Sequence, residues 1–124
     1  EYVYYTEFAE DIFAATLDAD DLPTVEQNFK KIFELYDEAV KISGKQPYIR
    51  ANYGLAYLTL ADVYAQLSRV EEAKVLYERG IEEYKKAIEY GRNNPIYSYT
   101  LAQGLVKLSR FESDRVLRSR SENP

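Results

Sequence analysis

The chain lacks cysteine, histidine, methionine and tryptophan altogether. Without cysteine it forms no disulfide, offers no thiolate nucleophile and binds no zinc through sulfur, and without histidine it lacks the most common general base and metal ligand. A catalytic base or nucleophile would have to be Asp, Glu, Lys, Tyr or Ser, and none of these stands in a glycine-rich loop or another recognisable catalytic setting. We therefore expect a protein that is not an enzyme and holds no cofactor.

The sequence also has no methionine at its start, which is Glu1. A start of this kind fits either a processed end, such as that left by a removed signal peptide, or the boundary of an expressed segment. The lack of cysteine and methionine also suits an oxidising or hot environment, although the heat-labile pair Asn93-Asn94 argues against heat. These observations favour an extracytoplasmic or secreted location.

The densest acidic cluster consists of Asp18, Asp20 and Asp21. A calcium loop needs alternating oxygen ligands, a glycine at its sixth position and a distal bidentate glutamate, and this run continues Leu-Pro-Thr without that glycine. We therefore predict no metal site here. The cluster is better explained as the end of one helix that places negative charge near the positive start of the next, a contribution of up to ~1 kcal/mol.

The net charge of −5 disfavours nucleic acid as a partner. The charge is unevenly distributed, because residues 1–29 contain eight acidic and no basic side chains, which gives −8 and leaves +3 on the remaining residues. From Lys107 onward five basic residues outnumber three acidic ones, for a net charge of +2. This asymmetry describes either an ordinary solvated surface or an acidic end that meets the basic end of another copy.

Two segments of the chain recur at long intervals. LSRVEEA at residues 67–73 returns as LSRFESD at residues 108–114, forty-one residues later, and YDEAVKISGKQPY at 36–48 aligns with YKKAIEYGRNNPI at 84–96. Self-similarity at a fixed period, in a chain with helical patterning, indicates stacked helical hairpins. The sequence therefore predicts an all-α repeat protein.

Recurring caps mark the expected helix boundaries. Capping boxes begin at Thr24, Ser68 and Ser109, and glycine stops followed by proline starts occur at residues 44–47 and 91–95. The expected helices span residues 5–18, 25–43, 48–67, 69–90, 96–108 and 110–120. These six helices would form three antiparallel hairpins, at residues 1–44, 45–91 and 92–124, within a single domain of residues 1–124.

The segment 48–67 has few strongly polar side chains, so we expect it to form the central, buried helix. A membrane span is the competing explanation, because about twenty apolar residues reach across a bilayer. Arg50 and Asp62 lie within the segment, however, and capped amphipathic segments flank it. We therefore predict no membrane span.

The second predicted hairpin carries aromatic, leucine and small residues at regular positions: Tyr57, Leu60, Ala61, Tyr64, Ser68, Ala73, Tyr77 and Gly80. In this pattern the chain resembles the tetratricopeptide repeat (TPR) family. The intervals of forty-one and forty-eight residues exceed the family's usual period of about thirty-four, so the helices would be longer than in the consensus. The resemblance implies three stacked hairpins in a right-handed superhelix, whose first helices line a concave groove that binds protein ligands.

The groove positions implied by this resemblance are mostly apolar. They are Leu55, Leu58, Asp62, Gln66, Ile96, Tyr99, Gln103 and Lys107. The family's carboxylate clamp needs Lys, Asn and Arg at set positions, and among the transferred positions only Lys107 is basic, so capture of a chaperone tail is not expected. Two interpretations remain open: the groove binds a peptide or a partner protein, or these side chains contact the next hairpin.

The two ends of the expected array are unlike. The first helix carries a wide apolar arc that includes Tyr2, Tyr5, Phe8, Ile12 and Phe13, whereas a terminal helix of a repeat array usually has a polar outer face. The last hairpin has few apolar residues and carries Arg110, Arg115 and Arg118. Either neighbouring helices of the same chain or another subunit would cover the arc. We expect these residues to join copies head to tail into a homopolymer, a filament or tube, with peptide binding in the groove as the alternative.

Overall fold

The computed structural model describes residues 2–122, which fold into five α-helices without a β-strand. The helices are α1 (Tyr2–Thr16), α2 (Leu22–Ser43), α3 (Pro47–Gln66), α4 (Val70–Tyr90) and α5 (Pro95–Glu122). The prediction of an all-α fold is confirmed. Glu1, on which the expectation about a processed start rests, lies outside the described residues, as do the last two residues of the expected domain.

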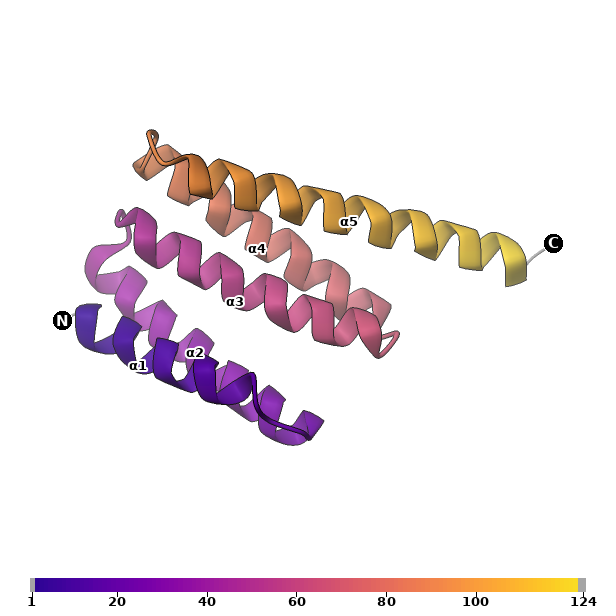
Figure 1. Ribbon diagram of the computed structural model, residues 1–124, viewed down its shortest axis with the longest axis horizontal. Coiled ribbons are helices and arrows are strands. Elements are labelled where there is room, and N and C mark those ends of the chain that lie inside the picture. The colour runs from indigo at the N-terminus through magenta and orange to yellow at the C-terminus, as the bar shows by residue number, and fades with distance from the viewer. Residues whose placement is uncertain (1, 123–124) are drawn as a thin grey trace.

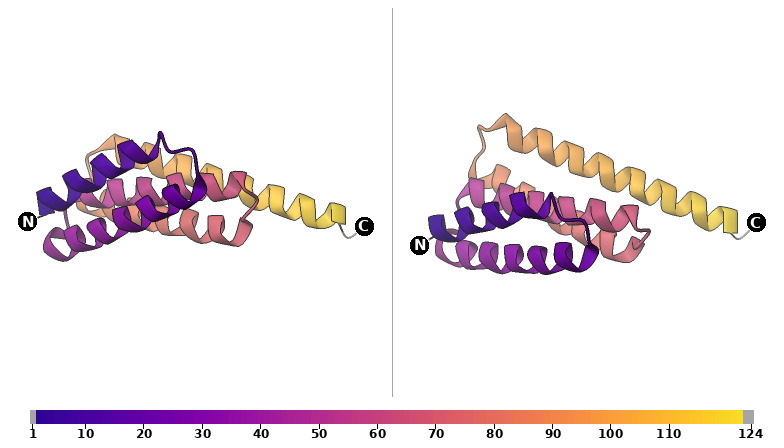
Figure 2. Two further views of the ribbon diagram at one scale, coloured as in Figure 1. Left: turned by 90° about the horizontal axis from the view of Figure 1, so that it is seen from below. Right: turned by 60° about the horizontal axis from the view of Figure 1, so that its bottom comes forward.

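The helices form a stack in which each lies roughly antiparallel to the next (Figure 1). The α1–α2 and α3–α4 pairs are hairpins with extensive packing, while the contact between α2 and α3 is smaller. The fifth helix lies along α4, at the opposite end of the stack from α1 (Figures 1 and 2). The described chain therefore consists of two complete hairpins followed by one unpaired helix.

The prediction of six helices is wrong, because α5 continues without a break through Ser109, where a sixth helix was expected to begin. No proline or glycine lies between Gly104 and the end of α5, so nothing in this stretch forces the helix to stop. Leu108 and Phe111 both pack against the core, and a continuous helix keeps the two on the same face. Up to Glu122, the segment that begins at residue 92 therefore contains a single helix and is not a hairpin, and the last third of α5 projects beyond α4 (Figure 1).

The capping boxes at Thr24 and Ser68 are also absent. Helix α2 begins at Leu22, two residues before Thr24, because Asp21 is its N-cap and accepts hydrogen bonds from the Thr24 amide at 3.0 Å and the Thr24 hydroxyl at 2.8 Å. These bonds hold the pKa of Asp21 below its usual value. Ser68 lies in the turn before α4 with a φ of 61°, and the N-cap of α4 is Arg69, which makes no side-chain capping bond.

The buried residues confirm that α3 is the central helix. Ile49, Ala56 and Ala61 on this helix are fully buried, and tyrosines of α3 stack on aromatic rings of α2. Arg50 and Asp62 interrupt its apolar surface, as the sequence indicates. Within residues 2–122, no helix has the combination of length and apolar character that a bilayer crossing requires.

Helices α3 and α4 approach each other closely at Gly54 and Gly80. A Cβ atom at Gly54 would lie 2.7 Å from Cδ2 of Tyr84, and a Cβ atom at Gly80 would lie 2.8 Å from Cδ2 of Leu58 and 3.1 Å from the Gly54 carbonyl oxygen. Real Cβ atoms essentially never come closer than 3.0 Å to another residue. The two glycines therefore set the distance between the central helices.

We expect Gly80→Ala to lower the free energy of unfolding by about 1–3 kcal/mol, because the added methyl group forces a tightly packed seam apart. Gly104→Ala on α5 is the matched control, since a Cβ atom there would lie at ordinary contact distances of 3.4 to 3.6 Å. The control change removes a flexible residue from a helix and should be neutral or stabilising by up to about 1 kcal/mol. Chemical denaturation measures both, and equal effects at the two positions would contradict the close approach.

Candidate functional site

Most of the apolar arc of α1 faces the chain's own core. Tyr2, Tyr5, Ile12 and Phe13 are half-buried and pack against it, and Phe13 makes an edge-on contact with Phe29 of α2 at 6.0 Å between ring centroids. Of the five predicted assembly residues on this helix, Phe8 is exposed, at 39%. Neighbouring helices of the same chain thus cover the greater part of the arc.

A smaller surface of α1 does face outward. We call the exposed residues Val3, Tyr4, Glu7, Phe8 and Asp11 the α1 outer face. Tyr4 is 61% exposed and meets Phe8 edge-on at 6.1 Å, so the two rings form a small aromatic patch. Tyr4 belongs to this patch, although it is not among the residues of the apolar arc predicted from the sequence.

The α1 outer face is acidic. Glu7 and Asp11 are exposed on it, and α1 contains no basic residue. Glu10 lies beside them, half-buried, and accepts a hydrogen bond from the Asn52 side chain of α3 at 3.2 Å. Partial burial, and then the negative charges of Glu7 and Asp11, raise the pKa of Glu10. The helix therefore presents aromatic side chains beside two exposed carboxylates, with the Lys31 ammonium of α2 6.0 Å from the Phe8 ring centroid.

At the other end of the stack, α5 exposes an apolar surface with basic edges. We call the residues that line its shallow groove the α5 outer face: Tyr99, Ala102, Gln103, Val106, Lys107 and Arg110. Tyr99 is 61% and Val106 48% exposed. Lys107 forms an ion pair with Asp62 at 2.8 Å, whereas Arg110 forms no ion pair with a described residue. Arg110 therefore leaves an uncompensated positive charge beside the apolar side chains.

The three arginines predicted for assembly have different environments. Arg115 lies 2.8 Å from Glu71 of α4 and 3.6 Å from Glu112, so it ties α5 to its own neighbour. Within the described chain neither Arg110 nor Arg118 takes part in an ion pair. Both line a depression beside Phe111 and Asp114. Arg110 and Arg118 are therefore the two that remain available to another molecule.

Two of the residues expected in the concave groove are engaged within the chain itself. Leu58 is 4% exposed and packs between Gly80 and Gly104, which removes it from contact with a ligand. Asp62 is held by Tyr77, whose hydroxyl donates to it at 2.7 Å, and by Lys107. Tyr99, Gln103 and Lys107 line the α5 outer face, Ile96 is exposed on the same side of α5 one turn before Tyr99, and Leu55 and Gln66 are exposed on α3.

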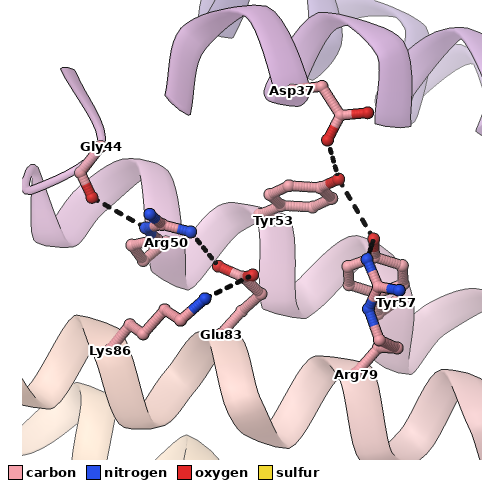
Figure 3. A network of polar contacts seen from close by, with 8 residues as sticks. All are labelled: Asp37, Gly44, Arg50, Tyr53, Tyr57, Arg79, Glu83 and Lys86. Atoms are coloured by element: carbon pink, nitrogen blue, oxygen red, sulfur yellow. Dashed lines mark hydrogen bonds and ion pairs between the residues drawn. The ribbon is translucent and has the colours of Figure 1, made fainter. Parts of the chain in front are cut away.

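A network of polar side chains crosses the interior between α2, α3 and α4 (Figure 3). The Tyr53 hydroxyl donates to Asp37 and accepts a hydrogen bond of 3.1 Å from Tyr57, whose oxygen in turn accepts one of 2.9 Å from Arg79. Among the described residues, no buried side-chain nitrogen or oxygen lacks a hydrogen-bond partner. The network, which joins residues far apart in the sequence, links three helices.

A second polar group in the same interior joins α3 to α4. The Arg50 guanidinium donates to the Gly44 carbonyl at 2.8 Å and to Glu83 at 3.0 Å, and Lys86 lies 3.7 Å from the same carboxylate (Figure 3). Each member is thus satisfied by the others and by the backbone. Over residues 2–122, no three potential metal ligands are grouped so that they could hold an ion.

Comparison with known proteins adds no relative: no family model, no curated protein and no solved structure matches the chain. The resemblance to the TPR family therefore stays a prediction from the residues themselves. What the geometry defines are two exposed faces, one at each end of the stack, with unlike charges.

Proposed function

We propose that the protein is a non-enzymatic assembly protein whose copies associate head to tail, with the α1 outer face of one copy against the α5 outer face of the next. The proposal rests on exposed apolar side chains that stand beside charges of opposite sign at the two ends of the stack. On α1, Tyr4 and Phe8 lie beside the acidic Glu7 and Asp11. On α5, Tyr99 and Val106 lie beside the basic Arg110. Apolar contacts would supply affinity, and the charges would set orientation and association rate.

The two faces are different surfaces, so contact between them is heterologous. A heterologous contact closes into a ring only if the rotation between copies permits it, and otherwise continues as an open polymer. The faces lie at opposite ends of the stack (Figure 1), which favours continued growth. In this proposal each added copy would extend a TPR-like right-handed superhelix into a filament or tube.

Reversing the charge on α5 tests the proposal. We expect Arg110→Glu combined with Arg118→Glu to raise the concentration needed for association at least about tenfold, because the new carboxylates would repel Glu7 and Asp11. The matched control is Lys30→Glu with Lys45→Glu, which makes the same charge change at exposed positions of α2 and the α2–α3 turn. Light scattering and electron microscopy at low salt measure association, and circular dichroism shows that each variant folds.

Two results would contradict the proposal. A wild-type protein that stays monomeric at high concentration and low salt would exclude self-assembly. Association that the arginine reversal leaves unchanged, with the same salt dependence, would exclude the electrostatic contact. If association is lost instead on changing the exposed Leu55 to Glu, the concave side is the interface, as the peptide-binding alternative requires.

A further inference from the structure

The end of the stack contains a groove where a sixth helix would pack. It runs between α4 and α5 and is lined by the apolar Val75, Ile81, Leu105 and Leu108 and by the charged Glu78, Arg79, Glu82 and Lys85. Ile81 is buried at its base, whereas Val75 is 57% and Leu105 46% exposed. In the two complete hairpins a second helix covers the corresponding side of α1 and of α3. Within the described chain, no helix does this for α5.

We propose that the α5 helix of a second copy fills this groove, so that two α5 helices pair antiparallel across a twofold axis. The partner helix would then lie where the second helix of a third hairpin belongs, against both α4 and α5. The proposal goes beyond the end-to-end contact, because it uses a different side of α5 from the one that carries Tyr99 and Val106. A twofold contact of this kind uses the same patch on both copies.

The spacing of residues on this side of α5 is self-complementary. Leu105, Ser109, Glu112 and Val116 follow one another at intervals of four, three and four residues, so they share one face of the helix. Leu105 and Val116 are equally distant from the midpoint between Arg110 and Phe111, and Ser109 and Glu112 are as well. An antiparallel copy centred at this midpoint therefore places Val116 against Leu105 at both ends of the contact, with the small Ser109 opposite Glu112.

The charges around the groove are compatible with this occupant. Glu112 lies 3.4 Å from Lys74 and 3.6 Å from Arg115 of its own chain. These cations would offset the repulsion between the Glu112 carboxylates of the two copies. The groove is lined by two acidic side chains, Glu78 and Glu82, and by two basic ones, Arg79 and Lys85, so these four charges balance.

The length of α5 supports the same pairing. The helix has 28 residues, against 15 to 22 in the other four, and its last third extends past the body of the protein (Figure 1). Val116, 47% exposed, lies on this projection. In the antiparallel pair each projection would lie over the groove of the other copy and be covered by it.

To test the twofold pair alone, head-to-tail association is first prevented by changing the α1 outer face. In a Glu7→Lys and Asp11→Lys variant, which leaves α5 intact, we expect sedimentation equilibrium to show a dimer. Adding Leu105→Glu should weaken that dimer at least about tenfold, because a charge would be buried in the apolar seam. Adding Gln103→Glu instead, on another side of α5, should leave the dimer unchanged.

Single cysteines give an independent readout, because the chain has none of its own. Ser109→Cys, close to the proposed twofold axis, should cross-link two copies through a short bismaleimide, and Gln103→Cys should not. A monomer in the α1-blocked background that gives no Ser109→Cys cross-link would overturn the twofold pair and leave the groove to a helix of another protein. A dimer in that background together with a wild type that forms no polymer would uphold the pair and remove the head-to-tail proposal.

Discussion

Replacing Glu83 with Ala is expected to lower the free energy of unfolding by about 3–5 kcal/mol, the cost of leaving a buried charge without its partner. The Arg50 and Glu83 side chains are 12% and 9% exposed and lie 3.0 Å apart, so the guanidinium would lose a charged partner at a place that solvent reaches poorly. The remaining guanidinium would keep only the Gly44 carbonyl as an acceptor. Urea denaturation followed by circular dichroism measures the change.

Two further variants distinguish a buried charge from a lost contact. Arg50→Met with Glu83→Leu removes both charges and should recover most of the stability, because apolar residues of similar volume often replace a buried ion pair without loss. Glu82→Ala breaks the exposed pair with Lys85 on the same helix, where both side chains are more than half exposed, and should cost less than about 1 kcal/mol. Equal losses at Glu83 and Glu82 would contradict the burial argument.

The sequence predicts the middle of this fold well, because strong local signals coincide there. Pro47 and Pro95 open α3 and α5 within one residue of the expected starts, and Gly44 and Gly91 follow the ends of α2 and α4. The apolar character of the α3 segment correctly indicates the central helix. In each case the residues that determine the structure are neighbours in the sequence.

The end of the chain shows where local signals are insufficient. Ser109-Arg110-Phe111-Glu112 satisfies a capping box as well as a true helix start does, yet a serine inside a helix is also tolerated. The choice between these depends on whether Leu108 and Phe111 pack on one neighbouring helix, which is a tertiary contact. The two similar segments, LSRVEEA and LSRFESD, thus have different structures. Ser68 of the first lies in a turn, whereas Ser109 of the second lies within a continuous helix.

The candidate faces could be predicted only in part. Helical periodicity identifies which residues of α1 share a side, but it does not say that α2 covers Tyr5 and Phe13 while Tyr4 faces outward. Likewise, the sequence shows the arginines of α5 but not that Arg115 is held by Glu71, forty-four residues earlier. Both gaps concern contacts between distant segments, for which a single sequence carries no direct signal.

A second large effect is expected at high pH, because the interior contains many tyrosines. Burial raises the pKa of Tyr84 to about 12, and burial with a hydrogen bond to Glu26 raises that of Tyr64 to about 12. Burial also raises the pKa values of Tyr36, Tyr53 and Tyr77 well above the usual value. All five are therefore protonated in the folded protein at a pH where the unfolded chain loses their protons.

The sign of the effect follows from this difference. A tyrosine whose pKa is higher in the folded state contributes its full stability below the unfolded value near 10, and that contribution falls as pH rises from there toward the folded value. Each such group lowers the free energy of unfolding by about 1.4 kcal/mol per pH unit within this window. The five groups act in the same direction, so together they remove a large part of the about 5–15 kcal/mol by which most domains of this size are stable.

We therefore expect the protein to unfold cooperatively between about pH 10 and 12, with tyrosinate absorbance and loss of helical circular dichroism changing together. Tyr84→Phe removes one buried phenol whose oxygen makes no hydrogen bond to another described residue. This variant should move the midpoint of alkaline unfolding to higher pH. It should also reduce the dependence of the free energy of unfolding on pH by about 1.4 kcal/mol per unit. Tyr4→Phe, at a position 61% exposed, is the control and should leave the midpoint in place. Tyrosinate absorbance that rises fully before helix is lost would show that the buried phenols ionise within the folded protein, contrary to this expectation.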